Sequence, residues 1–94
     1  MEMVRQLMRA YGITNRVEVS ERKDKKLKAL VDGRWIHFGH PDYEDFTTHR
    51  DKKRRANYCA RAGGIRDKRG RLTGNDPSSP NFYAMRLLWD CKPK

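Results

Sequence analysis

The dipeptide Asp32-Gly33, which lies between two short apolar segments, constrains the fold of this chain more than any other local feature. Leu30-Val31 precedes the dipeptide and Trp35-Ile36 follows it. An Asp-Gly pair in this setting is typical of a two-residue type I′ turn, because glycine readily adopts the positive φ that the turn requires. The sequence therefore predicts a β-hairpin centred on this pair.

Residues around the turn alternate in polarity with the period of two that is typical of strands. Val17 and Val19 alternate with polar neighbours, and residues 27–31 show a similar alternation. The polar run 21–26 supplies a turn between these two segments. We therefore expect a three-stranded antiparallel meander within residues 16–39.

Both ends of the chain show helical periodicity. The N-terminal apolar set is followed by Gly12 as a stop signal and comprises Met3, Val4, Leu7, Met8 and Tyr11. The C-terminal set follows Ser79-Pro80, where proline suits the first helical position, and comprises Phe82, Met85, Leu88 and Trp89. The sequence predicts an N-terminal helix or arm over residues 1–12, docked on the body or on a partner, and a closing helix over residues 80–89.

A basic helix is predicted over residues 48–62. Thr48 suits the N-cap position, Asp51 stands three residues later as in a capping box, and Gly63-Gly64 ends the helix through a left-handed conformation. Residues 63–79 are too polar and too rich in glycine to be buried, which indicates an exposed basic loop.

These patterns together predict an α+β fold in a single domain over residues 1–94. A small antiparallel meander is packed by the basic helix and by the short aromatic C-terminal helix. A chain of this length buries only about two thirds of its unfolded surface, so the core is modest. We expect the aromatic residues to supply much of that core, with stacking on exposed bases as the alternative.

Positive charge is concentrated in one quarter of the chain. The protein has 22 Lys and Arg residues against 12 Asp and Glu residues, for a formal net charge of +10. Ten of the basic residues and only two of the acidic ones lie between residues 48 and 71. Charge so concentrated indicates a polyanionic partner, and a solvated helix face that keeps the protein soluble is the alternative interpretation.

The spacing within this block predicts two faces of one helix. Tyr58, Cys59 and Ala62 share the face that packs on the sheet, and the polar stripe comprises Arg50, Arg54, Asn57 and Arg61. The residues that we expect to contact phosphate groups are Arg50, Lys53, Arg54, Arg61, Arg66, Lys68, Arg69 and Arg71. Nothing in the sequence predicts base readout.

Other kinds of site are not indicated. The polar residues that might act as ligands match no metal motif and comprise His37, His40, His49, Asp42, Glu44 and Asp45. We therefore expect no catalytic residue, no metal, no cofactor and no small-molecule substrate. Membrane binding is also not expected, because no apolar run approaches the roughly 18–20 residues that span a bilayer and the basic helix lacks large apolar residues for insertion.

The two cysteines, Cys59 and Cys91, form no C-x-x-C pair. We expect free thiols in a reducing compartment, in a soluble protein that is not secreted, with a disulfide between the two cysteines as the alternative.

Two segments resemble a small family of uncharacterised proteins of giant viruses, the nucleocytoplasmic large DNA viruses. The segments are FGHPDYEDFTTHRDKKRRANYCARAG and PNFYAMRLLW, within a resemblance that covers about residues 25–89. Its most specific parts are the Thr-x-His-x-Asp step over residues 47–51 and the Leu-Leu-Trp at residues 87–89. Ala62 departs from the family, which usually has histidine there, and the basic insert RDKRGR departs from a shorter and more acidic linker. The family carries no assigned catalytic residues.

The resemblance implies a viral protein that is packaged in the virion, or that acts in the host cytoplasm or virus factory during infection. Combined with the basic block, it leads to a non-enzymatic protein that binds nucleic acid independently of sequence. The alternative is a minor capsid or cement protein. Its basic patch would meet acidic faces of capsid proteins, and its apolar ends, residues 1–11 and 82–89, would clasp them.

Overall fold

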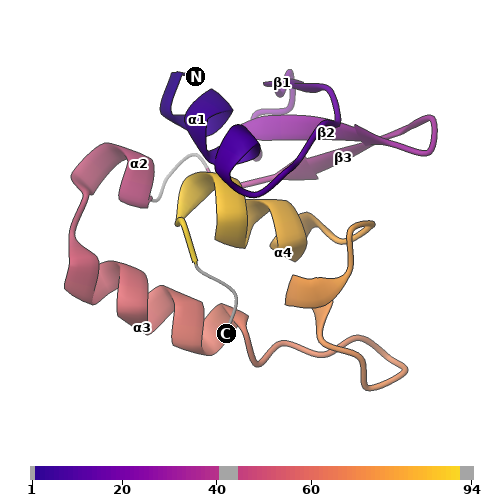
Figure 1. Ribbon diagram of the computed structural model, residues 1–94. Helices are drawn as coiled ribbons and strands as arrows, with labels where there is room; N and C mark the ends of the chain where they lie inside the picture. Colours follow the sequence, from indigo (N-terminus) through magenta and orange to yellow (C-terminus); the bar gives the residue numbers. More distant parts are fainter. Residues whose placement is uncertain (1, 41–44, 92–94) are drawn as a thin grey trace.

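An antiparallel sheet of three strands forms one layer of the structure, a computed structural model that describes residues 2–40 and 45–91. The strands follow the sequence order and are β1 (Val17–Val19), β2 (Leu27–Val31) and β3 (Arg34–Phe38). Figure 1 shows the sheet at one side of the molecule, with the helices arranged below and beside it. The predicted α+β class and the three-stranded meander are confirmed.

The β2–β3 hairpin has the predicted two-residue turn. Val31 pairs with Arg34 at the end of the ladder, and Asp32 and Gly33 have φ angles of 50° and 78°. Two successive positive φ angles are the signature of a type I′ turn, whose twist matches that of the flanking strands.

The core lies between the sheet, α1 (Glu2–Ala10) and the C-terminal helix, which consists of α4 (Pro80–Tyr83) and the π-helical turn η2 (Ala84–Leu88). Its buried residues are Val4, Leu7, Leu27, Ala29, Phe38, Tyr83, Ala84, Leu87 and Leu88. The N-terminal helix is therefore an integral part of the fold, and the hydroxyl of Tyr11 also donates to Asp90 Oδ1 at 2.7 Å.

The C-terminal helix begins where the sequence predicts and then widens. Ser79 Oγ accepts a hydrogen bond from the backbone N–H of Asn81 at 3.3 Å, and Pro80 occupies the first helical turn. Further on, the backbone N–H of Trp89 donates to Ala84 O, five residues earlier, at 3.2 Å. The expected single helix over residues 80–89 is thus an α-helical turn followed by a π-helical turn.

The predicted basic helix is interrupted. The structure has α2 (Phe46–His49) and α3 (Lys52–Ala62), separated by Arg50 with a φ of 54°. Thr48 was expected to be the N-cap, but it lies within α2.

Two aspartates take the capping role that was assigned to Thr48. Asp45 caps α2 by accepting from the backbone N–H of Thr47 at 3.0 Å. Asp51 caps α3, because its Oδ1 accepts from the N–H groups of Lys53 and Arg54 at 3.0 and 3.2 Å. A short carboxylate reaches the second and third free N–H groups of a helix, so Asp51 starts a new helix instead of completing a capping box.

The end of α3 agrees with the prediction in position and differs in mechanism. Gly63 follows the helix with a φ of −67°, so it does not use the left-handed conformation that was expected. A Cβ atom on Gly63 would lie 2.9 Å from the carbonyl oxygen of Cys59. Glycine is required here by close approach of the backbone.

Cys59 and Cys91 are joined by a disulfide, so the expectation of free thiols is wrong. Cys59 lies on α3 and Cys91 follows the C-terminal helix, with their Cα atoms 5.7 Å apart. The spacing of 32 residues contained no signal of this proximity, because only the packing of α3 beside the C-terminal helix creates it.

Candidate polyanion-binding surface

Several basic side chains have structural roles within the fold. Lys26 Nζ lies 2.6 Å from the buried carboxylate of Asp45. Arg55 pairs with Asp90 at 3.5 Å, and its guanidinium lies 4.6 Å from the centroid of the Phe46 ring. Neither Lys26 nor Arg55 was predicted as a binding residue.

Arg86 is also structural. Its Nη1 donates to the carbonyl oxygen of Gly74 at 2.7 Å, and its guanidinium lies 3.8 Å from the centroid of the Phe82 ring. Burial lowers the pKa of this guanidinium.

The predicted binding residues on α3 are exposed, but the expected stripe does not include Arg50. Lys53, Arg54 and Arg61 lie on α3 with exposed side chains. Arg50 is also exposed, but it is the C-cap of α2. Its left-handed backbone breaks the helical register, so the predicted alignment of Arg50 with Arg54 and Arg61 on one helix is wrong.

The other predicted residues lie on a short hairpin over residues 65–73, which we call the basic hairpin. Arg66 and Leu72 form an antiparallel bridge, and the backbone N–H of Thr73 donates to Ile65 O at 2.9 Å. Gly70 closes the turn with a φ of 80°. This segment was expected to be an exposed basic loop; it is exposed, and it forms a defined turn that presents Arg66, Lys68, Arg69 and Arg71.

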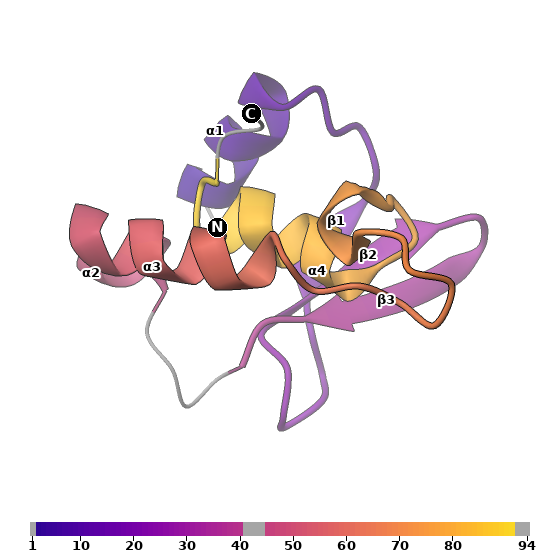
Figure 2. The same cartoon turned by 90° about the horizontal axis from the view of Figure 1, so that it is seen from below.

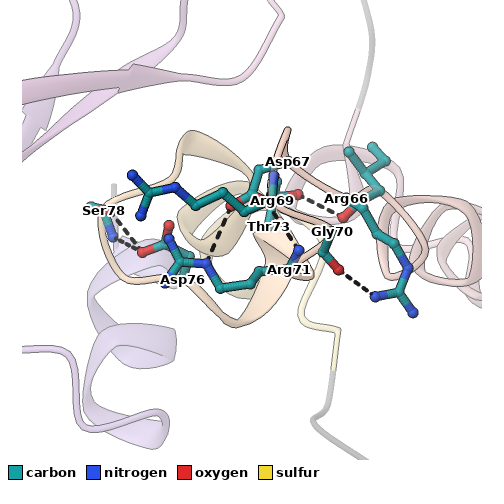
Figure 3. Close-up of polar contacts among 9 residues, drawn as sticks. Arg66, Asp67, Arg69, Gly70, Arg71, Thr73, Asp76 and Ser78 are labelled. Carbon is teal, nitrogen blue, oxygen red and sulfur yellow. Dashed lines mark hydrogen bonds and ion pairs between the residues drawn. The ribbon is translucent and has the colours of Figure 1, made fainter.

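One carboxylate organises the basic hairpin, as Figure 3 shows. Oδ1 of Asp67 accepts from the backbone N–H groups of Arg69 and Arg71 at 2.8 and 3.0 Å. The backbone N–H of Asp67 donates in turn to Arg71 O at 2.9 Å. Across the turn, Arg66 Nη1 donates to Gly70 O at 2.6 Å. These contacts hold the turn in one conformation although its side chains are largely exposed.

Asn81 joins the base of the basic hairpin to α3. Its Nδ2 donates to the carbonyl oxygen of Ala62 at 2.9 Å and to Thr73 Oγ1 at 3.0 Å. Thr73 Oγ1 donates to Ile65 O at 3.1 Å. Figure 1 shows α3 and the basic hairpin along the side of the molecule opposite α1, and Figure 2 views that side. The two basic segments are therefore held together by half-buried polar contacts of Asn81.

A cleft of about 600 Å³ adjoins α3. Lys25 and Lys26 before β2, Gly39 and His40 after β3, and Asp45 at the start of α2 form one part of its lining. The rest of the lining comes from α3, with Arg54, Asn57, Tyr58 and Arg61, and from the C-terminal helix, with Ala84, Leu88 and Trp89. Lys25 and Lys26 were not predicted as residues of this site. The register of the predicted hairpin could have located Lys26, since pairing of Leu27 with Phe38 brings Lys26 beside Gly39.

Two stacked rings form part of the cleft wall. The rings of Tyr58 and Trp89 lie parallel, with centroids 4.1 Å apart and an angle of 8° between their planes. Burial raises the pKa of the Tyr58 hydroxyl. The predicted use of aromatic residues in the core holds for Phe38 and Tyr83, which are 1% exposed, whereas Trp89 packs against the core and also lines the cleft together with Tyr58.

Residues 2–40 and 45–91 contain no cluster of three or more His, Cys, Asp or Glu side chains placed to hold a metal ion. Asp42 and Glu44, which belong to the polar residues considered above as ligands, lie outside the described residues. Within the described part of the chain, no helix has the length and apolar character needed to cross a bilayer.

Comparison with known proteins gave one family match. Residues 16–62, from the start of the sheet to the end of α3, match the model of a family described as a family of unknown function (DUF5754). No curated protein and no solved structure matched the chain.

Proposed function

The chain belongs to the family of unknown function DUF5754, and we propose that it is a non-enzymatic protein that binds the phosphate backbone of nucleic acid independently of sequence. Arg54 and Arg61 of α3 contact the backbone together with the basic hairpin. Arginine suits this role because its guanidinium binds phosphate oxygens through two parallel hydrogen bonds. Contacts of this kind position a protein on nucleic acid without reading the bases.

The observation that carries the proposal is the fixed placement of two basic segments on one side of the molecule. Asn81 holds the basic hairpin against the last turn of α3, and Asp67 holds the hairpin turn itself. Groups that are already ordered lose less conformational entropy on binding than a mobile loop does. This arrangement favours an extended anionic partner that spans both segments.

A viral setting is part of the proposal, in the virion or in the host cytoplasm or virus factory. Its support is the resemblance of residues 25–89 to proteins of giant viruses.

The alternative of a minor capsid or cement protein needs apolar anchors at the two ends of the chain. Val4 and Leu7 of α1, and Leu87 and Leu88 of the C-terminal helix, are buried in the protein's own core. We therefore favour nucleic acid over acidic faces of capsid proteins as the partner of the basic surface.

A salt titration of binding to duplex DNA tests the proposal. Each neutralised phosphate contributes about 0.9 to the slope of log K against log salt concentration. The double variant Arg54→Gln, Arg61→Gln should therefore lower that slope by about two. Affinity for unrelated duplexes of equal length should fall by the same factor.

A control variant with the same loss of charge is available on the opposite side. Arg5 and Arg9 are exposed on α1, so Arg5→Gln, Arg9→Gln removes two charges without touching α3 or the basic hairpin. The control should keep the wild-type slope. Equal loss in the two double variants would show that only net charge matters, and the assignment to α3 would be withdrawn.

A further inference from the structure

The cleft beside α3 combines two kinds of wall. Its described lining has four cationic side chains, Lys25, Lys26, Arg54 and Arg61, and one carboxylate, Asp45. Asp45 is 3% exposed and its Oδ2 accepts from Lys26 at 2.6 Å. The internal pair is neutral as a whole, and Lys25 and Arg61 add positive charge to the lining, which attracts anions.

The second kind of wall is apolar. Ala84 and Leu88 are buried, and Trp89 is stacked on Tyr58 with a centroid distance of 4.1 Å. Gly39 and Leu88 pack closely within the lining, because a Cβ atom on Gly39 would lie 2.6 Å from Leu88 Cδ1. Aromatic and aliphatic side chains therefore line the same cleft as the cations.

Asn57 adds a third kind of group to the lining. Its carboxamide has both donors and an acceptor, which match the hydrogen-bonding edge of a heterocyclic base. A volume of about 600 Å³ lies in the range of sites for small organic ligands and greatly exceeds what an inorganic phosphate ion requires.

We infer that this cleft binds one nucleoside phosphate unit, either a free nucleotide or an unpaired nucleotide of a single strand. The phosphate lies among the cationic side chains, with Lys25 and Arg61 as principal contacts. The base lies on the apolar wall near Trp89 and Asn57, as bases stack on aromatic side chains in proteins that bind single strands. The inference rests on the proposed function and deepens it, since contact with the outside of a duplex would leave this wall unused.

The indole N–H resonance of Trp89 provides the measurement. The protein has two tryptophans, and Trp35 lies on β3 with Lys28 over its ring, outside the cleft lining. Trp35→Phe therefore leaves one indole signal in a ¹H–¹⁵N spectrum, which belongs to Trp89. This protein is titrated separately with dAMP, inorganic phosphate, deoxyadenosine and the single strand (dA)₈.

We expect dAMP or (dA)₈ to shift the Trp89 signal in a saturable way. Inorganic phosphate and deoxyadenosine should bind at least about tenfold more weakly, because each engages only one wall. Arg61→Gln in the Trp35→Phe background should weaken nucleotide binding about tenfold, as expected for loss of one charged hydrogen-bonding partner. Arg9→Gln should leave it unchanged.

The separate titrations distinguish the possible ligands. A shift with (dA)₈ and none with dAMP assigns the cleft to strands, and a shift with both at similar affinity per nucleotide assigns it to free nucleotides as well. Equal affinity for phosphate and dAMP overturns the inference, as does the absence of any saturable shift.

Failure of this inference is distinguishable from failure of the proposed function. Salt-dependent duplex binding without a Trp89 shift removes the cleft assignment and leaves backbone binding in place. A Trp89 shift without duplex binding supports the cleft assignment and removes binding to the duplex backbone.

Discussion

Removal of the disulfide between Cys59 and Cys91 should destabilise this protein more than any single surface substitution. The bond closes a loop with a sequence separation of 32 residues. In the chain-entropy model, loops of 15 and 100 residues correspond to about 3 and 4.7 kcal/mol, so this bond should contribute about 3.5 kcal/mol. A small domain has a total stability of about 5–15 kcal/mol, so the loss is a large fraction.

The expected change is a fall in Tm of roughly 15–25 °C for a domain of this size. It is measured by circular dichroism for the wild type, for the wild type in dithiothreitol and for Cys59→Ala, Cys91→Ala. The reduced wild type keeps both sulfur atoms in place, so it isolates the covalent bond from the packing of Cys91, which is 6% exposed. The double variant serves as the control for the reductant, since dithiothreitol should not change its Tm.

The bond also ties α3 to the end of the C-terminal helix, so reduction should weaken duplex binding through the loosened position of Arg54 and Arg61. An unchanged Tm of the wild type in dithiothreitol, with full reduction verified by mass, would refute the reasoning. It would show that α3 is held by packing alone.

Three further outcomes follow from particular contacts. Asp67→Ala should weaken duplex binding in the salt titration although it makes the protein more positive, because the basic hairpin loses the carboxylate that orders it; tighter binding would favour charge alone. Gly39→Ala should cost more than about 1 kcal/mol in urea denaturation, because of its φ of 83° and the contact with Leu88, and an unchanged midpoint would contradict that. Burial and the hydrogen bond to Asp90 raise the pKa of Tyr11 in the folded protein, so its contribution is complete below about pH 10 and declines above it. Between pH 8 and pH 10.5, the free energy of unfolding measured by urea titration should therefore fall less for Tyr11→Phe than for the wild type.

Local patterns in the sequence determined the elements that depend on neighbouring residues. Asp32-Gly33 specified the type I′ turn, and the alternation on either side of it specified the strands. Pro80 marked the start of the C-terminal helix, and the spacing of Val4 and Leu7 marked the buried face of α1. These features follow from backbone preferences and side-chain periodicity, which act over a few residues and can be read in one dimension.

The sequence was less informative where two neighbouring residues could each play the same structural role. Thr48 and Asp51 are both good helix caps, and the structure uses Asp51 because α2 ends at the left-handed Arg50. The sequence also indicated a basic block, but it did not show which of the cationic side chains pair with other groups of the fold. Arg55 lies in the same block as Arg54, but only the packing of α3 places it beside Asp90.

Tertiary structure alone decided the disulfide and the cleft. Cys59 is bonded to Cys91, and Lys25 lines the same cleft as Arg61 and Trp89, across separations much longer than one helix or hairpin. No periodicity connects such residues, because their proximity results from how the sheet, α3 and the C-terminal helix pack on a shared core. The basic composition could therefore be read from the sequence, whereas the arrangement of the basic side chains on the surface is a property of the packed molecule.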